Sequence, residues 1–331
     1  MAYVRGRMAR PAGVGSLVVA GLVALAGCSR ADPGGQRSAA TSGASRAAQP
    51  FDFGRPLEAL RLTGDAFAAR AGSFSWAGEV TWTVEKPGAP LVKAVERHRL
   101  RQLATGDFHV SATIDPGDGP GSERGKQIVF TSGMTYGRSR WAPFRERPTD
   151  RGRDARRFRD ESLLFPAEIA DLYGPALTAQ PAGESTSAGR RARRYRLALS
   201  GSAPGPSAPA PAPPGAGYDA DTKRRLAFLE GRVPTAASGE LLLDAETGVP
   251  LSIVLKGSFS EKDDPQLRVD VDLTAHVEAL GRAVPPVHAP EGALADDRKP
   301  KGVARALEAA GLRKRTGDER RTDGDGESSD E

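Results

Sequence analysis

The sequence predicts an α+β domain built on a curved antiparallel sheet, an open half-barrel with helices on its concave face. Two observations lead to this prediction. Several long segments alternate apolar and polar residues, which is typical of antiparallel strands with one buried face. Two other segments, 56–70 and 161–177, repeat apolar residues at helical spacing, so they can form helices that cover that face.

The helices and strands are expected in the following order. Leu57, Leu60 and Phe67 share one face of the first helix, and Pro166 suits the first turn of the second. In the second strand, Val95 and Arg97 are in phase and Leu100 is not. The alternating segments predict strands over 74–84, 92–103, 108–114, 127–131, 134–140, 190–199, 239–243, 249–259 and 267–277.

Composition divides the 331 residues into four parts. Residues 1–27 are expected to be a signal peptide, and 28–52 a lipidated N-terminus followed by a flexible tether. The sheet domain is expected over 53–292, with a Pro-, Ala- and Gly-rich insert at 201–217 that cannot form a core. Residues 293–331 are charged and low in apolar residues, which predicts a mostly disordered tail.

The export prediction depends on a short apolar segment. Residues 13–27 are small or apolar throughout, too short for the roughly 20 residues of a membrane span. The segment ends in Leu25-Ala26-Gly27-Cys28, which resembles the lipobox of bacterial lipoproteins. The resemblance implies that Cys28 receives diacylglycerol and anchors the chain in the cell envelope. Because Ser29 follows rather than Asp, it further implies the outer membrane, facing the periplasm, if the host is Gram-negative.

Charge gives little support to a nucleic-acid partner. Removing Arg5, Arg7 and Arg10 with the signal peptide takes the formal net charge from +5 to about +2. The stretch 145–159 is rich in arginine, but Asp150 and its neighbours interleave with it. This pattern favours a solvated face over a site for anionic headgroups or nucleic acid.

The candidate ligand-binding residues are aromatic and apolar. Phe74, Trp76, Val80 and Trp82 fall on one face of the strand over 74–84. They would form either the wall of a ligand cavity or the core of the sheet. Trp141 lies outside the alternation and would line an opening or pack beneath a loop.

No catalytic, metal or cofactor site is expected. The four histidines (His98, His109, His276 and His288) are scattered, and none is paired at helical i, i+4 spacing. Cys28 is the only cysteine, so a thiolate zinc site is excluded along with an internal disulfide. P-loop, dinucleotide-binding and Gly-x-Ser-x-Gly patterns are absent. These observations predict a protein that is not an enzyme.

One motif and the overall layout carry a family resemblance. The motif is Leu243-Asp244-Ala245-Glu246-Thr247-Gly248-Val249-Pro250-Leu251, a hairpin turn between two late strands. With the lipobox and the lead helix, it resembles the half-barrel lipoprotein carriers of the LolA, LolB, LprG and LppX type. The insert at 201–217 and the charged tail depart from that pattern. The resemblance implies an open barrel whose hydrophobic cavity binds acyl chains.

Two functions therefore remain open. The first is a membrane-anchored protein that binds a lipid or other apolar ligand in the cavity of a curved sheet. The second is a structural or assembly lipoprotein of the envelope that docks a protein partner. Cavity volume separates the two, because a carrier needs space for its ligand and a docking protein does not.

Overall fold

A computed structural model describes residues 50–140, 142–148, 150–200 and 228–296. The chain divides into two units, 1–294 and 295–331, and the description below concerns the first. Several predicted features lie outside the described residues. They are the signal peptide, Cys28, the tether before residue 50, Trp141, the insert at 201–217 and the tail from residue 297.

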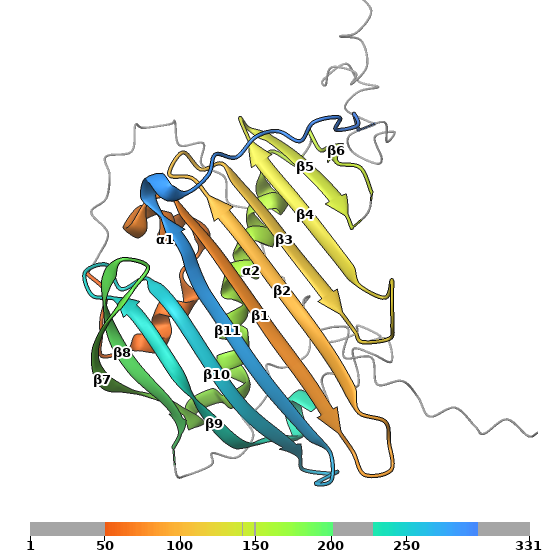
Figure 1. The fold of residues 1–331 in the computed structure, drawn as a ribbon, viewed down its shortest axis with the longest axis vertical. Coiled ribbons are helices and arrows are strands. Elements are labelled where there is room, and N and C mark those ends of the chain that lie inside the picture. The colour runs from red at the N-terminus through yellow and green to blue at the C-terminus, as the bar shows by residue number, and fades with distance from the viewer. Residues whose placement is uncertain (1–49, 141, 149, 201–227, 297–331) are drawn as a thin grey trace, which may run out of the picture. The chain divides into compact units, whose positions relative to one another are not determined.

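The described residues form an eleven-stranded sheet, shown in Figure 1. The strand order is β6-β5-β4-β3-β2-β1-β11-β10-β9-β8-β7, and every neighbouring pair is antiparallel. The strands are β1 Phe74–Glu85, β2 Val92–Gln102, β3 Phe108–Asp115, β4 Arg124–Thr131, β5 Met134–Ser139, β6 Arg145–Glu146, β7 Leu177–Ser187, β8 Arg190–Leu199, β9 Arg232–Asp244, β10 Pro250–Glu261 and β11 Arg268–Leu280.

The sheet consists of two antiparallel meanders that meet where β1 pairs with β11. Strands β1 to β6 step outward in one direction, and β11 back to β7 step outward in the other. β1 pairs with β11 at the centre, over Phe74–Glu85 and Arg268–Leu280. Helix α2, Arg153–Tyr173, follows β6 and precedes β7, so it carries the chain from one edge of the sheet to the other. A helix in that position must cross one face of the sheet.

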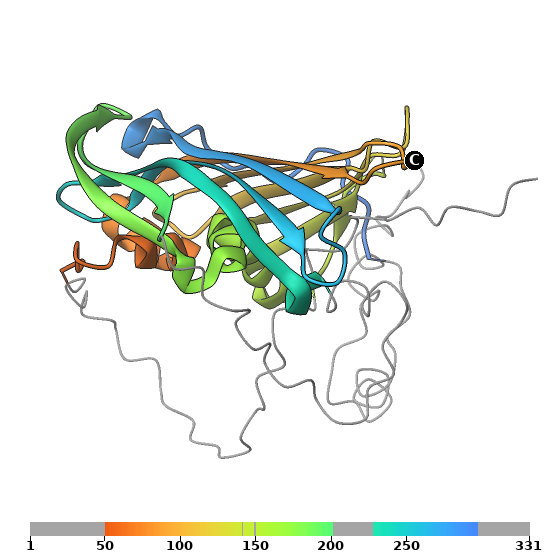
Figure 2. The same ribbon diagram turned by 90° about the horizontal axis from the view of Figure 1, so that it is seen from below.

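The sheet is strongly curved and unclosed, with its helices on the inner side. Figure 2 shows β7, β8 and β9 curling around, with the helices beneath the sheet. The helical segments there are the 3₁₀ helix η1, Pro56–Arg61, and the α-helices α1, Gly64–Ala71, and α2. The predicted fold class, a curved antiparallel half-barrel with helices on its concave face, is confirmed.

The helix boundaries differ from the prediction. The first helix is broken at Leu62, and Thr63 starts α1 by accepting a hydrogen bond from Ala66 N at 3.3 Å. The second helix begins at Arg153 rather than 161, so Pro166 lies inside it rather than in its first turn. The reason is a cap that the apolar pattern does not reveal. Asp150 accepts hydrogen bonds from the backbone N–H groups of two residues in the first turn, at 2.6 and 3.2 Å.

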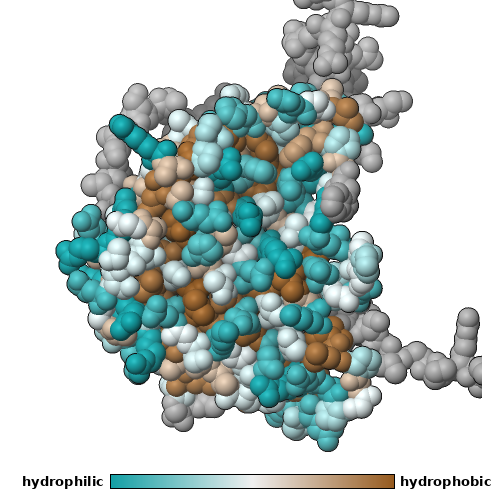
Figure 3. Space-filling view, viewed as in Figure 1, coloured by the Kyte–Doolittle hydropathy of each residue, from teal (hydrophilic) through white to brown (hydrophobic). Residues whose placement is uncertain are grey.

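The two faces of the sheet have different surfaces. The concave face is apolar over most strands and is buried under the helices. The opposite face, which Figure 3 presents, mixes hydrophilic and apolar side chains. The chain after β11 reaches the β6 edge of the sheet. There Leu294 N donates to Phe144 O at 2.8 Å, and Leu294 O accepts from Glu146 N at 2.9 Å. The edge at β6 is therefore partly covered by the chain itself.

The predicted hairpin turn at 244–248 is confirmed, and its sequence motif has a clear physical role. The Asp244 carboxylate is almost fully buried and accepts hydrogen bonds from Glu246 N, Thr247 N and Thr247 Oγ1 at 2.8–3.0 Å. Its other oxygen accepts from Arg190 Nη1 at 3.1 Å. Gly248 has a φ of 69°, and a Cβ there would overlap the Phe51 ring.

Candidate functional site: the concave face

The predicted ligand-binding residues of β1 lie together on the concave face. Phe74, Trp76, Val80 and Trp82 are each at most 3 % exposed. They alternate with residues of the convex face, as the period-two pattern predicts. Leu100 of β2 stands beside Trp76, and the concave residues of β11 continue the same surface on the other side. We call the four β1 residues the aromatic wall, and they are brought together as predicted.

Helices α1 and α2 cover the aromatic wall directly. Phe67 of α1 stacks on Phe74 with ring centroids 4.2 Å apart. Phe165 of α2 meets Trp76 edge-on, at 5.6 Å between ring centroids. Since helix side chains occupy the positions that a ligand would take, the wall serves as sheet core in this conformation.

Gly78 gives α2 its close approach to β1. It occupies the concave position between Trp76 and Val80, where the apolar alternation of β1 has a gap. A Cβ at this position would overlap the Phe165 ring and would lie 2.8 Å from Trp76 Cη2. The absence of a side chain at residue 78 is therefore the reason that Phe165 can lie against the strand.

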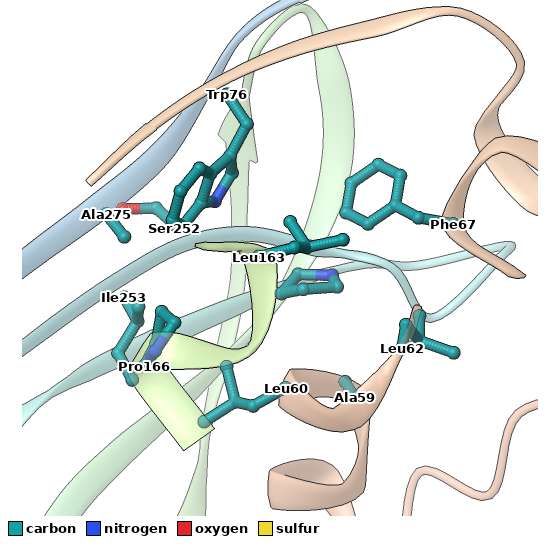
Figure 4. A pocket seen from close by; sticks show the side chains of 11 residues that line it. Ala59, Leu60, Leu62, Phe67, Trp76, Leu163, Pro166, Ser252, Ile253 and Ala275 are labelled. Atoms are coloured by element: carbon teal, nitrogen blue, oxygen red, sulfur yellow. The ribbon is translucent and has the colours of Figure 1, made fainter. Parts of the chain in front are cut away.

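The space left between helices and sheet is very small. A void of about 10 Å³ lies where α2 crosses η1, and Figure 4 shows Leu163 and Pro166 of α2 reaching between Trp76 and Leu60. Ligand pockets measure roughly 300–1,000 Å³, so this void is far too small for an acyl chain. A ligand that reaches the aromatic wall must displace part of α2.

The contact between α2 and β2 is unexpectedly polar. Glu96, His98 and Gln102 of β2 point to the concave side and are buried, as are Arg159 and Ser162 of α2. We call these five residues the polar seam. His98 Nε2 lies 2.8 Å from Glu96 Oε1, and the imidazole stacks on the Phe165 ring at 4.5 Å between centroids.

Part of the polar seam lacks hydrogen-bond partners. His98 Nδ1, Gln102 Oε1 and Ser162 Oγ are buried and have no protein partner in the described part of the chain. The hydroxyl of Tyr173, at the other end of α2, is unpartnered too, and burial raises the pKa of this phenol. Each such group costs about 1–3 kcal/mol when buried. The seam therefore offsets part of the apolar stabilisation of α2 on the sheet.

Arg159 joins α2 to α1 through two carboxylates. Its side chain is 1 % exposed, and its Nη1 donates to Asp65 Oδ1 at 2.6 Å. Its Nε donates to Asp160 Oδ1 at 2.9 Å, and the same oxygen accepts from Gly64 N. The hydrogen bond from Arg159 holds the pKa of Asp65 below its usual range, against the effect of burial. Both helices are thereby fixed to each other as well as to the sheet.

Sequence reasoning missed the seam because it assigned β2 the wrong buried face. The expected phase put Val95 and Arg97 together, with Leu100 as the exception. In the structure Leu100 shares the buried face with Glu96 and His98, while Arg97 pairs with Glu79 on the convex face. The signal that could have identified this face is the alternation of Ala94, Leu100 and Gln102 with exposed basic residues.

Other candidate chemistry is dispersed. His109 faces the convex side, where burial and the nearby Arg101 and Arg138 lower its pKa. His276 lies on β11, and His288 follows it in the chain. Over the described ranges, no three His, Cys, Asp or Glu side chains converge on a point that could hold a metal ion. None of the helices in those ranges combines the length and apolar character of a membrane span.

The fold and site define an open half-barrel whose concave face is covered by its own helix. No protein-family model matches the sequence, and a search of curated proteins found no match. Among solved structures, MucB is similar at 17 % identity and a TM-score of 0.26, over 72 % of this chain. The chain spans 62 % of that MucB chain, less than two thirds of its length.

Two further solved structures are similar in layout. One is the LolA superfamily protein NE2245 from Nitrosomonas europaea, at 10 % identity and a TM-score of 0.19, over 69 % of this chain and 96 % of that one. The other is an outer membrane lipoprotein-sorting protein domain from Vibrio parahaemolyticus, at 8 % identity and a TM-score of 0.19. That match covers 67 % of this chain and 92 % of the domain.

Proposed function

We propose that this protein is a membrane-anchored, non-enzymatic binding protein that holds a lipid or other apolar ligand against the aromatic wall. In this proposal the lipobox cysteine, Cys28, is lipidated and places the domain in the cell envelope. Displacement of α2 would expose the wall, and an acyl chain would replace the side chains of Leu163 and Phe165. Trp141 is retained as a candidate residue at the opening.

The observation that carries the proposal is the mismatch between the two surfaces that α2 joins. The aromatic wall and β11 offer a continuous apolar surface to a ligand. The helix that covers it brings Arg159 and Ser162 against Glu96, His98 and Gln102, with three of their polar atoms unpartnered. An apolar ligand on the aromatic wall and β11 would replace α2 there, and the displaced Arg159 and Ser162 would reach water.

The magnitudes support a helix that can be displaced. Each large apolar side chain of α2 stabilises the docked helix by about 1.5–3 kcal/mol. The three unpartnered polar atoms of the seam offset roughly 3–9 kcal/mol at 1–3 kcal/mol each. The seam therefore lowers the free energy needed to displace α2, and a ligand shifts the equilibrium between the closed and open states by its greater affinity for the open one.

The test is native mass spectrometry of the delipidated protein after exposure to an envelope lipid extract. To make the purified protein soluble, Cys28→Ala removes the anchor. We expect lipid adducts on this parent and more of them on an Asp65→Asn variant, because loss of the ion pair with Arg159 weakens the docking of α2. An Asp264→Asn variant is the matched control, since Asp264 pairs with Lys86 away from α2. A parent without adducts, together with an inert Asp65→Asn variant that remains folded, would refute the proposal.

The filled concave face also favours a second candidate, a structural or assembly lipoprotein that docks a protein partner. Docking needs no cavity, and the space of about 10 Å³ meets that condition without movement of α2. The solved MucB structures include complexes with MucA, so a protein partner is a reasonable comparison. Crosslinking in the native envelope, followed by identification of a partner in the absence of lipid adducts, would select this candidate over the first.

A further inference from the structure

The N-terminal half of α2 has a charge distribution that opposes helix stability. Arg153, Arg156 and Arg157 lie in its first two turns and Arg151 just precedes it, whereas its last turns carry Glu168 and Asp171 and no basic residue. The positive end of the helix dipole is at the N-terminus, where Asp154 and the Asp150 cap are favourable and the arginines are not. The helix dipole therefore does not account for the arginines.

The structure separates charges that the sequence interleaves. Asp150 turns inward, where it caps α2 and accepts a hydrogen bond from Thr135 Oγ1 at 2.7 Å. Asp160 turns inward to Arg159 and Gly64 N. By contrast, the side chains of Arg153 and Arg157 are 87 % and 63 % exposed. Thus the stretch that reads as a mixed, solvated face in the sequence presents mainly its arginines to solvent.

The exposed acids beside these arginines do not neutralise the surface. Arg153 pairs with Asp154 at 3.4 Å, and Arg157 with Glu161 at 2.8 Å. Exposed pairs of this kind are weak and exchange readily with solvent ions. Arg151 and Arg156 are exposed as well, and the Arg156 guanidinium lies over the Phe130 ring at 5.5 Å.

Adjacent elements add to the positive charge. Lys126 of β4 lies over the Phe158 ring of α2 with its ammonium 4.3 Å from the centroid. Burial, together with the neighbouring Arg147, lowers the pKa of this lysine. We define the basic face as the exposed Arg151, Arg153, Arg156 and Arg157, with the half-buried Lys126 and Arg147 beside them.

We propose that the basic face binds the anionic headgroups of a lipid bilayer. The void at the α2–η1 crossing and the hollow on the convex side near Lys256 both lie away from the basic face. A face of spread, solvent-exposed arginines fits an extended, planar anionic surface better than a small ligand or a folded acidic protein. The predicted anchor at Cys28 would keep such a surface within reach. If the proposed ligand function also holds, this contact would place the start of α2 at the bilayer, where an apolar ligand enters or leaves.

The test uses the full mature chain with Cys28→Ala and vesicles of phosphatidylcholine, with or without phosphatidylglycerol, in a cosedimentation assay. We expect binding that requires phosphatidylglycerol and weakens as salt is raised. Each basic side chain near an anionic surface contributes about fivefold to partitioning, so replacing Arg153, Arg156 and Arg157 by Gln should lower binding on the order of 100-fold. The melting temperature of this variant should be unchanged or higher, because the removed charges oppose the helix dipole.

The matched control replaces Arg191, Arg194 and Arg196 of β8 by Gln. This variant removes the same charge from the other end of the sheet and should retain vesicle binding. An equal loss of vesicle binding in both variants would show that binding depends on net charge alone and would overturn the proposal. Equal binding to phosphatidylcholine alone, or no binding to either vesicle, would also overturn it, the latter being the outcome for a protein or nucleic-acid partner. Lipid adducts measured on the same variants by native mass spectrometry report on the ligand function separately.

Discussion

Replacing Gly78 by Ala tests whether the docking of α2 depends on a missing side chain. The new Cβ would overlap Phe165 and lie 2.8 Å from Trp76 Cη2, a distance that real Cβ atoms do not tolerate. Phe165 and Trp76 are both buried, so neither ring can move without disturbing the core. Overpacking of this kind costs about 1–3 kcal/mol. At an interior strand position with open space around the Cβ, Gly→Ala would instead stabilise by about 0.5–1 kcal/mol.

A double-mutant cycle, measured by urea unfolding, separates the cost of overpacking from the gain in strand stability. Phe165→Ala alone should cost about 3–5 kcal/mol, because it removes a buried ring. In that background Gly78→Ala no longer meets the Phe165 ring, and Trp76 can shift into the space that the ring leaves, so its cost should fall. The reasoning is refuted if Gly78→Ala is neutral in the parent protein, or if it costs the same with and without the Phe165 ring.

Three further predictions concern the hairpin turn, the anchor and the polar seam. Asp244→Ala should lower the free energy of unfolding by about 1–3 kcal/mol in urea titrations, since four hydrogen bonds lose their acceptor. Although burial acts to raise its pKa, hydrogen bonds from Thr247 and Arg190 hold the pKa of Asp244 below 3.8. The contribution of Asp244 to the free energy of unfolding is therefore complete above pH 3.8 and is lost as the pH falls further. A parent and an Asp244→Ala variant that lose stability equally in acid would contradict this. Cys28→Ala should move the protein from the membrane to the soluble fraction, and unchanged fractionation would refute the anchor. Replacing both Glu96 and His98 by Leu should leave the free energy of unfolding unchanged or raise it by about 1–4 kcal/mol, whereas His98→Ala alone should lower it by about 3–5 kcal/mol. A double variant that is less stable than His98→Ala in thermal unfolding would refute the interpretation of the seam.

The alternation of apolar residues was enough to predict most of the sheet. β1, β3, β10 and β11 bury apolar residues at alternate positions, so the sequence shows a period of two and the strands were placed correctly. The hairpin at 244–248 was predicted equally well, because its Asp, Thr and Gly each satisfy a specific requirement of the turn. The aromatic wall followed from the same alternation.

The misplaced elements share a physical cause, which is that tertiary partners determine them. β7 was missed because its residues are mostly exposed at an edge, so no apolar pattern marks it. α2 was expected to start at residue 161 because apolar residues at helical spacing begin there, whereas the Asp150 cap that starts the helix at Arg153 lies before that pattern. The buried face of β2 was misassigned because Glu96 and His98 are stable there only against each other and Phe165. Such compensation between distant segments cannot be read from local periodicity.

Pro166 divides α2 into halves that are held differently, which leads to a prediction about how the helix opens. The second half is bound by apolar and direct contacts: Tyr173 lies 4.5 Å from Phe259 between ring centroids, and Arg232 donates to Leu172 O at 2.8 Å. The first half rests on the polar seam and carries the basic face. Since proline has no N–H, the helical hydrogen bond to Ser162 O is missing where the halves meet.

Displacement of α2 should therefore begin with its first half, while the second half stays on the sheet. Native-state hydrogen exchange measures this directly, because backbone amides exchange through local opening. We expect amides in 157–165 to exchange faster than those in 167–173, and phosphatidylglycerol vesicles to change only the first group. Uniform protection along α2 that is lost only with global unfolding would mean that the helix is a permanent part of the core. In that case the aromatic wall would be unavailable to any ligand, and the docking of a protein partner on the outer surface would be the function to pursue.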